Sequence, residues 1–195
     1  MHSAAAQGRA DEIKRLCECE CGTVVNRVVN NTNSNGDTPV FLAAAKGHTM
    51  CVKVLYEFGA DLSFFTSDMR TPIYVAAKGG HLECLKFILD QNASLERKCP
   101  AHTLRNWNDW LGCKCLRSIK RTVDAKTPLF VAAEGGHTEC IRVLHNFDPH
   151  VIHQQANGSG QTAVHRAAQK GQHSAIRILH ELGADINKNC FPKIL

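Results

Sequence analysis

Four residues in the middle of the chain have the types and the spacing of a zinc site. Cys99 and His102 form a Cys-x-x-His pair, and Cys113 and Cys115 follow as a Cys-x-Cys pair. Thiolates and imidazoles are the usual ligands of structural zinc, and four of them complete its tetrahedral shell. The Cys-x-Cys half is unusual for zinc, and a place in a helical core is the competing explanation for Cys115. We therefore predict no bound metal or other cofactor and keep these four residues as the candidate set.

The same segment carries the excess positive charge of the chain. Residues 97–126 contain eight Lys or Arg and two acids, a charge of +6, whereas the whole chain has a formal charge of +5. Trp107 and Trp110 lie among these cations, and aromatic rings beside a basic groove can stack on the bases of a single strand. The alternative is a solvated helix face with both tryptophans in the core, and it makes nucleic acid the less expected ligand. The cations of this basic patch are Arg105, Lys114, Arg117, Lys120 and Arg121.

Other clusters of cysteine and histidine have simpler explanations than chemistry. The stretch Cys17-Glu-Cys19-Glu-Cys21 has no fourth metal ligand nearby. The histidines between residues 145 and 153 are expected to be exposed loop residues. The sequence contains no phosphate-binding loop, no nucleophile elbow and no metal-hydrolase helix. These observations predict a protein that is not an enzyme.

A repeated stretch determines where all of these residues are placed. It runs from Thr71 as TPIYVAAKGGHLECLK, and related copies begin at Thr38 (TPVFLAAAKGHTMCVK), Thr127 (TPLFVAAEGGHTECIR) and Thr162 (TAVHRAAQKGQHSAIR). Thr38 and Thr71 are 33 residues apart, and Thr127 and Thr162 are 35 residues apart. A fixed period of this size is typical of a stacked-repeat protein.

Each copy has the signals of two short helices joined by a tight turn. The threonine is a suitable N-cap, and proline follows it at the first helical position in three of the copies. The alanine pair lets neighbouring helices approach closely, and the second half of each copy has apolar residues at helical spacing. The turn glycines, which fit a positive φ angle, are Gly47, Gly80, Gly136 and Gly171.

The copies resemble the ankyrin repeat, whose hallmark is Thr-Pro-Leu-His-x-Ala-Ala followed by Gly-His. The resemblance covers nearly the whole chain and implies an all-α repeat solenoid, in which helix-turn-helix units stack and short hairpin-like fingers join them. In three copies an aromatic residue replaces the first histidine of the hallmark, which remains only at His165, and we expect these rings to pack at the junctions between repeats. The three rings belong to Phe41, Tyr74 and Phe130. The histidines after the turn glycines are structural in this family: His48, His81 and His137.

In this register the chain, residues 1–195, is a single array. Residues 1–32 are a degenerate N-terminal repeat, and 33–65 and 66–96 are two regular repeats. Residues 122–156 are another repeat, and 157–195 are the C-terminal repeat with its tail. Thr71 and Thr127 are 56 residues apart, so the period breaks between them. Residues 97–121 are therefore either a degenerate, truncated repeat or a helical insertion, and the similarity of residues 114–119 to residues 83–88 favours the truncated repeat.

Ten cysteines in 195 residues favour a reducing compartment over a disulfide framework. Cys51, Cys84 and Cys140 occupy the same position in three copies and are expected to be small buried side chains. Stacked helices lie about 8–10 Å apart, whereas a disulfide needs Cα atoms within about 7 Å, so consecutive copies cannot bridge. The sequence shows no secretory signal and no apolar run of transmembrane length. We expect a monomeric, intracellular protein, cytoplasmic rather than nuclear, with no transmembrane segment.

The resemblance implies a non-catalytic scaffold that binds another protein on the concave surface of the finger tips and the first helices. Residues that vary between copies while the frame persists are the candidates for this contact. The sign pattern, with Asp37 followed by Arg70 and Lys126, favours a partner with acidic groups at its far end. The predicted partner-binding residues are Asp37, Lys46, Asp68, Met69, Arg70, Lys78, Asp124, Lys126, Glu134, Gln161 and Lys170.

Two other functions stay open from the sequence. The array could be a regulatory or targeting module of a larger enzyme or channel, in which case the reading frame extends beyond these residues. The basic segment 97–126 could bind a polyanion, either nucleic acid or an anionic membrane, in which case affinity falls steeply with salt. The family resemblance also makes Asn187, in the Leu-x-x-x-x-Asn context that begins at Leu182, a candidate acceptor for hydroxylation.

Overall fold

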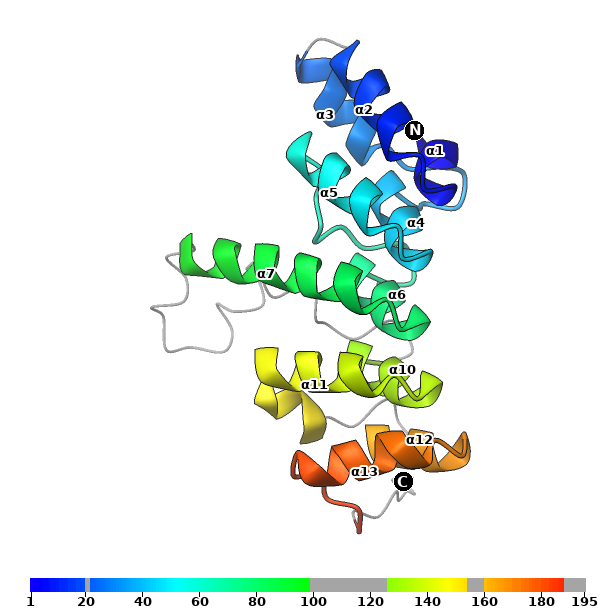
Figure 1. Cartoon of the computed structure of the whole chain (residues 1–195), viewed down its shortest axis with the longest axis vertical. Helices are drawn as coiled ribbons and strands as arrows, with labels where there is room; N and C mark the ends of the chain where they lie inside the picture. The colour runs from blue at the N-terminus through cyan, green and yellow to red at the C-terminus, as the bar shows by residue number, and fades with distance from the viewer. Residues whose placement is uncertain (20–21, 99–125, 154–159, 188–195) are drawn as a thin grey trace.

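The computed structural model describes residues 1–19, 22–98, 126–153 and 160–187 of the chain. Within these ranges the regular elements are helices, apart from a single bridge residue at Gln161. None of the helices so described is both long enough and apolar enough to pass through a bilayer. The helices form one elongated stack, with the first repeat at one end and the last repeat at the other (Figure 1).

The stack has two layers of helices, one from the first and one from the second helix of each repeat. Each helix packs on the helix of the same layer in the neighbouring repeat, which confirms the expected all-α solenoid (Figure 1). The first layer contains α1 (His2–Ala6), α4 (Pro39–Ala45), α6 (Pro72–Gly79), α10 (Pro128–Gly135) and α12 (Ala163–Gln169). The second layer contains α2 (Ala10–Glu18), α5 (Thr49–Glu57), α7 (Leu82–Lys98), α11 (Thr138–Phe147) and α13 (His173–Glu181).

The Thr-Pro pairs begin the first helices as the sequence predicts. The side-chain oxygens of Thr38, Thr71 and Thr127 each accept a hydrogen bond from the backbone N–H three residues later, at 3.3, 3.2 and 3.2 Å. These threonines are buried, so each cap satisfies a backbone donor that water cannot reach. In the fourth copy the backbone N–H of Thr162 donates to Nδ1 of His165 at 3.2 Å, the reciprocal bond that the aromatic replacements have lost.

The core of the array lies between the two layers. The alanine pairs of α4, α6 and α10 have no exposed surface, which allows the close approach of helices that their size predicts. The rings of Phe41, Tyr74 and Phe130 are only 5, 6 and 2% exposed, so the aromatic replacements are part of this core as expected.

In each described repeat after the first, the side chain that follows the turn glycine bonds to the preceding repeat. An Nε2–H group of the residue after the turn glycine donates to a backbone carbonyl at the C-terminal end of the preceding first helix. These carbonyls have no partner within their own short helices, so the next repeat caps them. The four bonds are His48 to Ala6 (3.2 Å), His81 to Ala45 (3.2 Å), His137 to Lys78 (3.1 Å) and Gln172 to Glu134 (3.4 Å).

Glycine is required at the turns because these side chains lie directly against them. A Cβ atom on Gly80 would lie 2.5 Å from Nδ1 of His137, and one on Gly8 would lie 2.9 Å from Nδ1 of His48. Both glycines also have positive φ angles, 72° and 75°. The Gly-His pair is therefore a structural joint, in agreement with the role that the resemblance implies.

The described stack is continuous across the region where the period of the sequence breaks. Helix α6 packs directly on α10, and α7 packs directly on α11. His137 accordingly reaches the carbonyl of Lys78 across 59 residues of sequence. Of the predicted segment 97–121, only the last two residues of α7 lie within the described ranges, so the choice between a truncated repeat and an insertion stays a prediction.

Helix α7 extends beyond the predicted repeat boundary at residue 96, and the sequence explains its length. Helices α5 and α13 are followed by Gly59 and Gly183, which have φ angles of 89° and 91°. The corresponding position in the third repeat is Asn92, so no glycine stops the helix, and α7 continues to Lys98. In Figure 1 this helix projects well beyond its neighbours.

A further helix, α3 (Gly22–Asn30), lies between the first repeat and its finger, where no helix is predicted from the sequence. Val25 and Val29 are 7% and 0% exposed, so one face of α3 belongs to the core. The amide of Asn30 holds its end, because Nδ2 donates to the carbonyl of Gly59 at 2.9 Å and Oδ1 accepts from the backbone of Asp61 at 2.7 Å. A short 3-10 helix, η2 (Pro149–His153), occupies a similar place after α11.

Candidate functional site

The fingers before α4 and α6 are closed turns that hold their tip residues in fixed positions. In the first finger the backbone N–H of Asn33 donates to the carbonyl of Asp37 at 3.0 Å. The Asn33 side-chain oxygen accepts from the backbone of Asn35 and of Asp37, both at 2.9 Å. Asp37, a predicted partner-binding residue, is therefore fixed at the base of a hydrogen-bonded loop and is half-buried.

The second finger has the same closure with different residues. Thr66 replaces Asn33: its backbone N–H donates to the carbonyl of Arg70 at 3.0 Å, and its hydroxyl accepts from the backbone of Arg70 at 3.3 Å. Met69 has a φ angle of 60° at the position where the first finger has Gly36, with 78°. A side chain in this left-handed region is strained, and such strain tends to occur at functional positions.

Arg70 and Asp68, two of the predicted partner-binding residues, contact each other. The Nη2 atom of Arg70 lies 2.7 Å from Oδ2 of Asp68, and the guanidinium carbon lies 6.0 Å from the centre of the Phe41 ring in the preceding repeat. The carboxylate and the ring face both attract the cation and fix its orientation. Arg70 therefore presents a pre-oriented guanidinium on a side chain that is 40% exposed.

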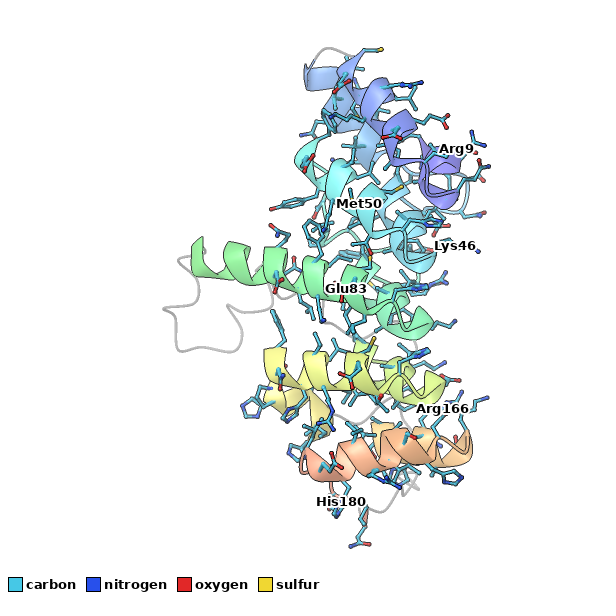
Figure 2. All side chains as sticks on the ribbon, viewed as in Figure 1. Arg9, Lys46, Met50, Glu83, Arg166 and His180 are labelled. Carbon is cyan, nitrogen blue, oxygen red and sulfur yellow. The ribbon has the colours of Figure 1, made fainter. Side chains whose placement is uncertain are left out.

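Lys46 and Lys78 lie at the C-terminal ends of α4 and α6, on the edge of the stack formed by the tight turns. Both side chains are exposed, and neither has an ion-pair partner among the residues that the structure describes. In Figure 2 the labelled Lys46 lies on this edge, as do Arg9 and Arg166 in the first and last repeats.

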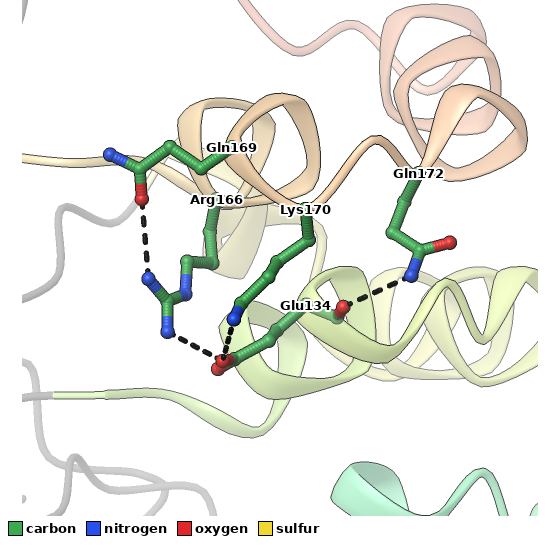
Figure 3. Close-up of polar contacts among 5 residues, drawn as sticks. All are labelled: Glu134, Arg166, Gln169, Lys170 and Gln172. Atoms are coloured by element: carbon green, nitrogen blue, oxygen red, sulfur yellow. Dashed lines mark hydrogen bonds and ion pairs between the residues drawn. The ribbon is translucent and has the colours of Figure 1, made fainter.

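Glu134 and Lys170, two further predicted residues, belong to a network of ion pairs between the last two repeats (Figure 3). Arg166 Nη2 lies 2.5 Å from Glu134 Oε1, and Lys170 Nζ lies 4.0 Å from the same oxygen. Gln169 accepts a hydrogen bond from the other end of the guanidinium at 3.2 Å. Glu134 and Arg166 are 28% and 25% exposed, so the pair is largely shielded from water.

The surroundings of Glu134 favour its charged form. Burial by itself raises the pKa of this carboxyl group. The hydrogen bond and the charge of Arg166, together with the charges of Lys126 and Lys170, outweigh burial and hold the pKa below its ordinary value of 4.5. Glu134 is therefore an acid whose charge is already neutralised within the protein, not one that is free for a partner.

The structure brings some of the remaining predicted residues to the same surface and leaves others undescribed. Lys126 and Gln161 directly precede the N-caps of α10 and α12 and are half-buried. Asn187 is exposed in a turn beyond α13, where its backbone N–H donates to Oδ1 of Asp185 at 2.9 Å. Asp124, the basic patch and the zinc candidates lie outside the described residues. Within the described ranges no group of three or more metal-ligating side chains comes together.

Arg166 is the residue of this surface that the prediction from sequence missed. It lies over the Phe130 ring, 6.0 Å from its centre, and bonds Glu134. The sequence held a signal for it, because the other copies have apolar residues at the same position: Leu42, Val75 and Val131. A lone arginine at an otherwise apolar position of a repeat indicates a charge partner in the neighbouring repeat.

The repeated cysteines are inert core residues, as expected. Cys51, Cys84 and Cys140 are buried free thiols. Burial raises the pKa of all three, to about 12 for Cys84 and, with a further contribution from the charge of Glu139, to about 11 for Cys140. A thiol with a raised pKa in an apolar site is a poor nucleophile, so these residues are not catalytic candidates.

The two-layered stack, the closed fingers and the Gly-His joints define a helical repeat scaffold. A family model described as ankyrin repeats (3 copies) matches residues 1–99 and 107–190, and the chain therefore belongs to the ankyrin repeat family. Ankyrin repeats are generally protein–protein interaction modules and are typically non-catalytic. A comparison with curated protein sequences found no match.

Proposed function

We propose that this protein is a non-catalytic scaffold that binds one protein partner on the surface formed by its fingers and first helices. The observation that carries the proposal is that the shared and the variable residues of each repeat lie in different places. The residues shared by the copies are buried caps, core alanines and turn joints, whereas the residues that differ are exposed or half-buried at the fingers and at the ends of the first helices. A rigid frame with variable exposed side chains is how repeat proteins achieve specific binding.

The geometry of the fingers supports a binding role for their tips. Side-chain bonds from Asn33 and Thr66 close both turns, so little conformational entropy is lost when a partner binds. Met69 adds an apolar side chain at a strained position beside the fixed guanidinium of Arg70. An aliphatic side chain beside an oriented cation is suited to a protein surface that is partly apolar and partly acidic.

The test is partner capture by a variant with reversed charges on this surface. Changing Arg70, Lys78 and Lys126 to Glu should abolish recovery of the native partner by the tagged protein, while the far-UV circular dichroism spectrum stays that of the folded array. The matched control changes Lys14, Lys53 and Lys86 to Glu, because these exposed residues lie on the second helices and the change of charge is equal. Full capture by the first variant, or an equal loss in both, would contradict the proposal.

We also propose that the protein functions in a reducing, intracellular environment. Cys51, Cys84 and Cys140 are free thiols stacked in one core, and Cys19 is an exposed free thiol. An exposed free cysteine is a liability in an oxidising compartment, where it forms mixed disulfides. Detection of the native protein in the cytosolic or nuclear fraction of its cells would support the proposal, and its detection in the secreted fraction would contradict it.

A further inference from the structure

Among the residues that the structure describes, the cations of the first-helix layer have an acidic partner at the C-terminal end of the stack and none at Lys46 and Lys78. Glu134 and Lys78 occupy the same position in consecutive repeats of the stack, and Lys170 and Lys46 likewise occupy one position. In the C-terminal repeats Glu134 pairs with both Arg166 and Lys170 and offsets one of their two positive charges. In the N-terminal repeats no described acid pairs with Lys46 or Lys78. Lys46 and Lys78 are therefore cations of this layer that no described acid engages.

The backbone holds these two lysines at a fixed separation. The carbonyl of Ala45, next to Lys46, accepts a hydrogen bond from His81, and the carbonyl of Lys78 accepts one from His137. Both lysines thus lie at the end of a helix that the following repeat caps. Their helices, α4 and α6, pack directly on each other. Packed helices have axes about 8–10 Å apart, so the backbones from which the two exposed side chains extend are about that far apart.

We propose that Lys46 and Lys78 bind an extended acidic segment of the partner protein, with carboxylates three residues apart, and that Arg70 binds a further carboxylate beside them. This inference rests on the proposed function. An extended chain advances about 3.3 Å per residue, so three residues span about 10 Å and match the spacing of the two helices. The guanidinium of Arg70 is already oriented by Asp68 and Phe41, and its planar fork suits a carboxylate.

A protein segment fits this surface better than a nucleic acid does. Asp37 and Asp68 lie on the fingers of the same two repeats, and a continuous phosphate backbone that crossed the first helices would meet them. A peptide places single carboxylates at the cations and neutral residues elsewhere. The half-buried side chains of Leu42 and Met69 also offer apolar contact on the same surface.

The test uses a fluorescein-labelled peptide with Glu at every third position between Ser and Gly, measured by fluorescence anisotropy at low ionic strength. The native protein should bind it, and the double variant Lys46→Glu, Lys78→Glu should bind at least tenfold more weakly. The same peptide with Gln in place of Glu should not bind. The matched control Lys14→Glu, Lys86→Glu has an equal change of net charge on the second helices and should bind like the native protein.

Three results would overturn the inference. They are no binding of the Glu peptide by the native protein, an equal loss of binding in the control variant, and tighter binding of a single-stranded oligothymidylate that shows the same dependence on Lys46 and Lys78. The last result would assign the surface to nucleic acid. Capture of the native partner by the double variant with undiminished yield would also refute the acidic segment, yet it would leave the proposed scaffold function intact. Circular dichroism and the unfolding midpoint verify that each variant is folded.

Discussion

At the scale of single residues, one finger tip has a residue type that is strained in its backbone conformation. Two of the described fingers have glycine at the left-handed tip position, Gly36 and Gly160, and the second finger has Met69 there. An L side chain in the left-handed region costs about 1–2 kcal/mol, whereas glycine costs about 0.5–1 kcal/mol of extra entropy on folding. The strain at Met69 is retained although a cheaper residue exists, which is consistent with a contact role for its side chain.

Replacing Met69 by Gly should therefore stabilise the protein by about 0.5–1 kcal/mol, measured by urea unfolding, while partner capture becomes weaker. The comparison variant is Gly36→Ala in the first finger. A Cβ there would meet nothing within 4 Å, so the positive φ angle of 78° is the only penalty, and this variant should be destabilised. A Met69→Gly protein that is less stable and captures the partner fully would show that Met69 is a packing residue.

The ion pair of Glu134 predicts a specific dependence of stability on pH. The folded protein lowers the pKa of this carboxyl group, so it stabilises the fold at pH values above the ordinary 4.5, and this contribution disappears as the pH falls through the lowered value. Glu134→Gln should lower the urea midpoint at neutral pH, and its difference from the native protein should shrink in acid. Glu181→Gln, which breaks the more exposed pair with Arg142, should have a smaller effect. A Glu134→Gln difference that is constant with pH would contradict this account.

At the scale of elements, the ends of the second helices decide how each repeat is connected to the next. A glycine with positive φ ends α5 and α13, Asp148-Pro149 ends α11, and neither signal is present at Asn92 in α7. The next helix that the structure describes is α10, which packs directly on α6. Although the sequence favours a truncated repeat for residues 97–121, the packing of α10 on α6 leads us to propose an insertion.

This preference can be tested with a chimera. Replacing residues 92–125 by a copy of residues 59–69 gives the third repeat the linker of the second and restores a spacing of 33 residues between Thr71 and the threonine that is now Thr127. The chimera should be monomeric by gel filtration and should unfold in one cooperative urea transition with the helical signal expected for its length. Loss of cooperative unfolding would indicate that the replaced segment is a structural unit of the stack. A deletion of 92–125 without the linker is the negative control, since it should prevent the joint between Lys78 and His137.

The sequence predicted this architecture closely where the signal is local. Thr-Pro caps, alanine pairs and turn glycines can each be recognised within one repeat, and the structure has them in their expected places. Predictions that depend on contacts between repeats were less complete. The lone arginine at position 166 gave the only sign of the Glu134 network, and α3 was missed because Asn30 is held by Gly59 and Asp61, about 30 residues away in sequence. A single sequence does not show which surface residues are paired.

At the scale of the whole molecule, the histidine joints make the stack cooperative. A repeat protein is stabilised by its own repeats and by the interfaces between nearest neighbours, and each described interface contains one of these hydrogen bonds. The ring also fills the space beside two glycines, as His81 does against Gly47 and Gly79. Loss of the His81 side chain thus removes both a partly buried hydrogen bond and packing.

Changing His81 to Ala should destabilise the array by about 1–3 kcal/mol, because it leaves the carbonyl of Ala45 unsatisfied. Hydrogen exchange should show lost protection concentrated in α4 and α5. His81→Gln is the matched variant, since Gln172 already makes the equivalent bond in the last repeat, and it should retain more than half of the lost stability. Equal losses in the two variants would show that packing, not the hydrogen bond, dominates the joint.

These joints also determine the order in which the repeats can be completed during synthesis. The first helices α1, α4, α6 and α10 each receive a C-terminal cap from the repeat that follows. On the ribosome, where the N-terminal repeats emerge first, α4 can form its own Thr38 cap at once, but the carbonyl of Ala45 waits for His81, 36 residues later. Completion of the array during synthesis therefore trails the emerging chain by one repeat. A stalled nascent chain should be most sensitive to protease in its last synthesised repeat, whichever repeat that is.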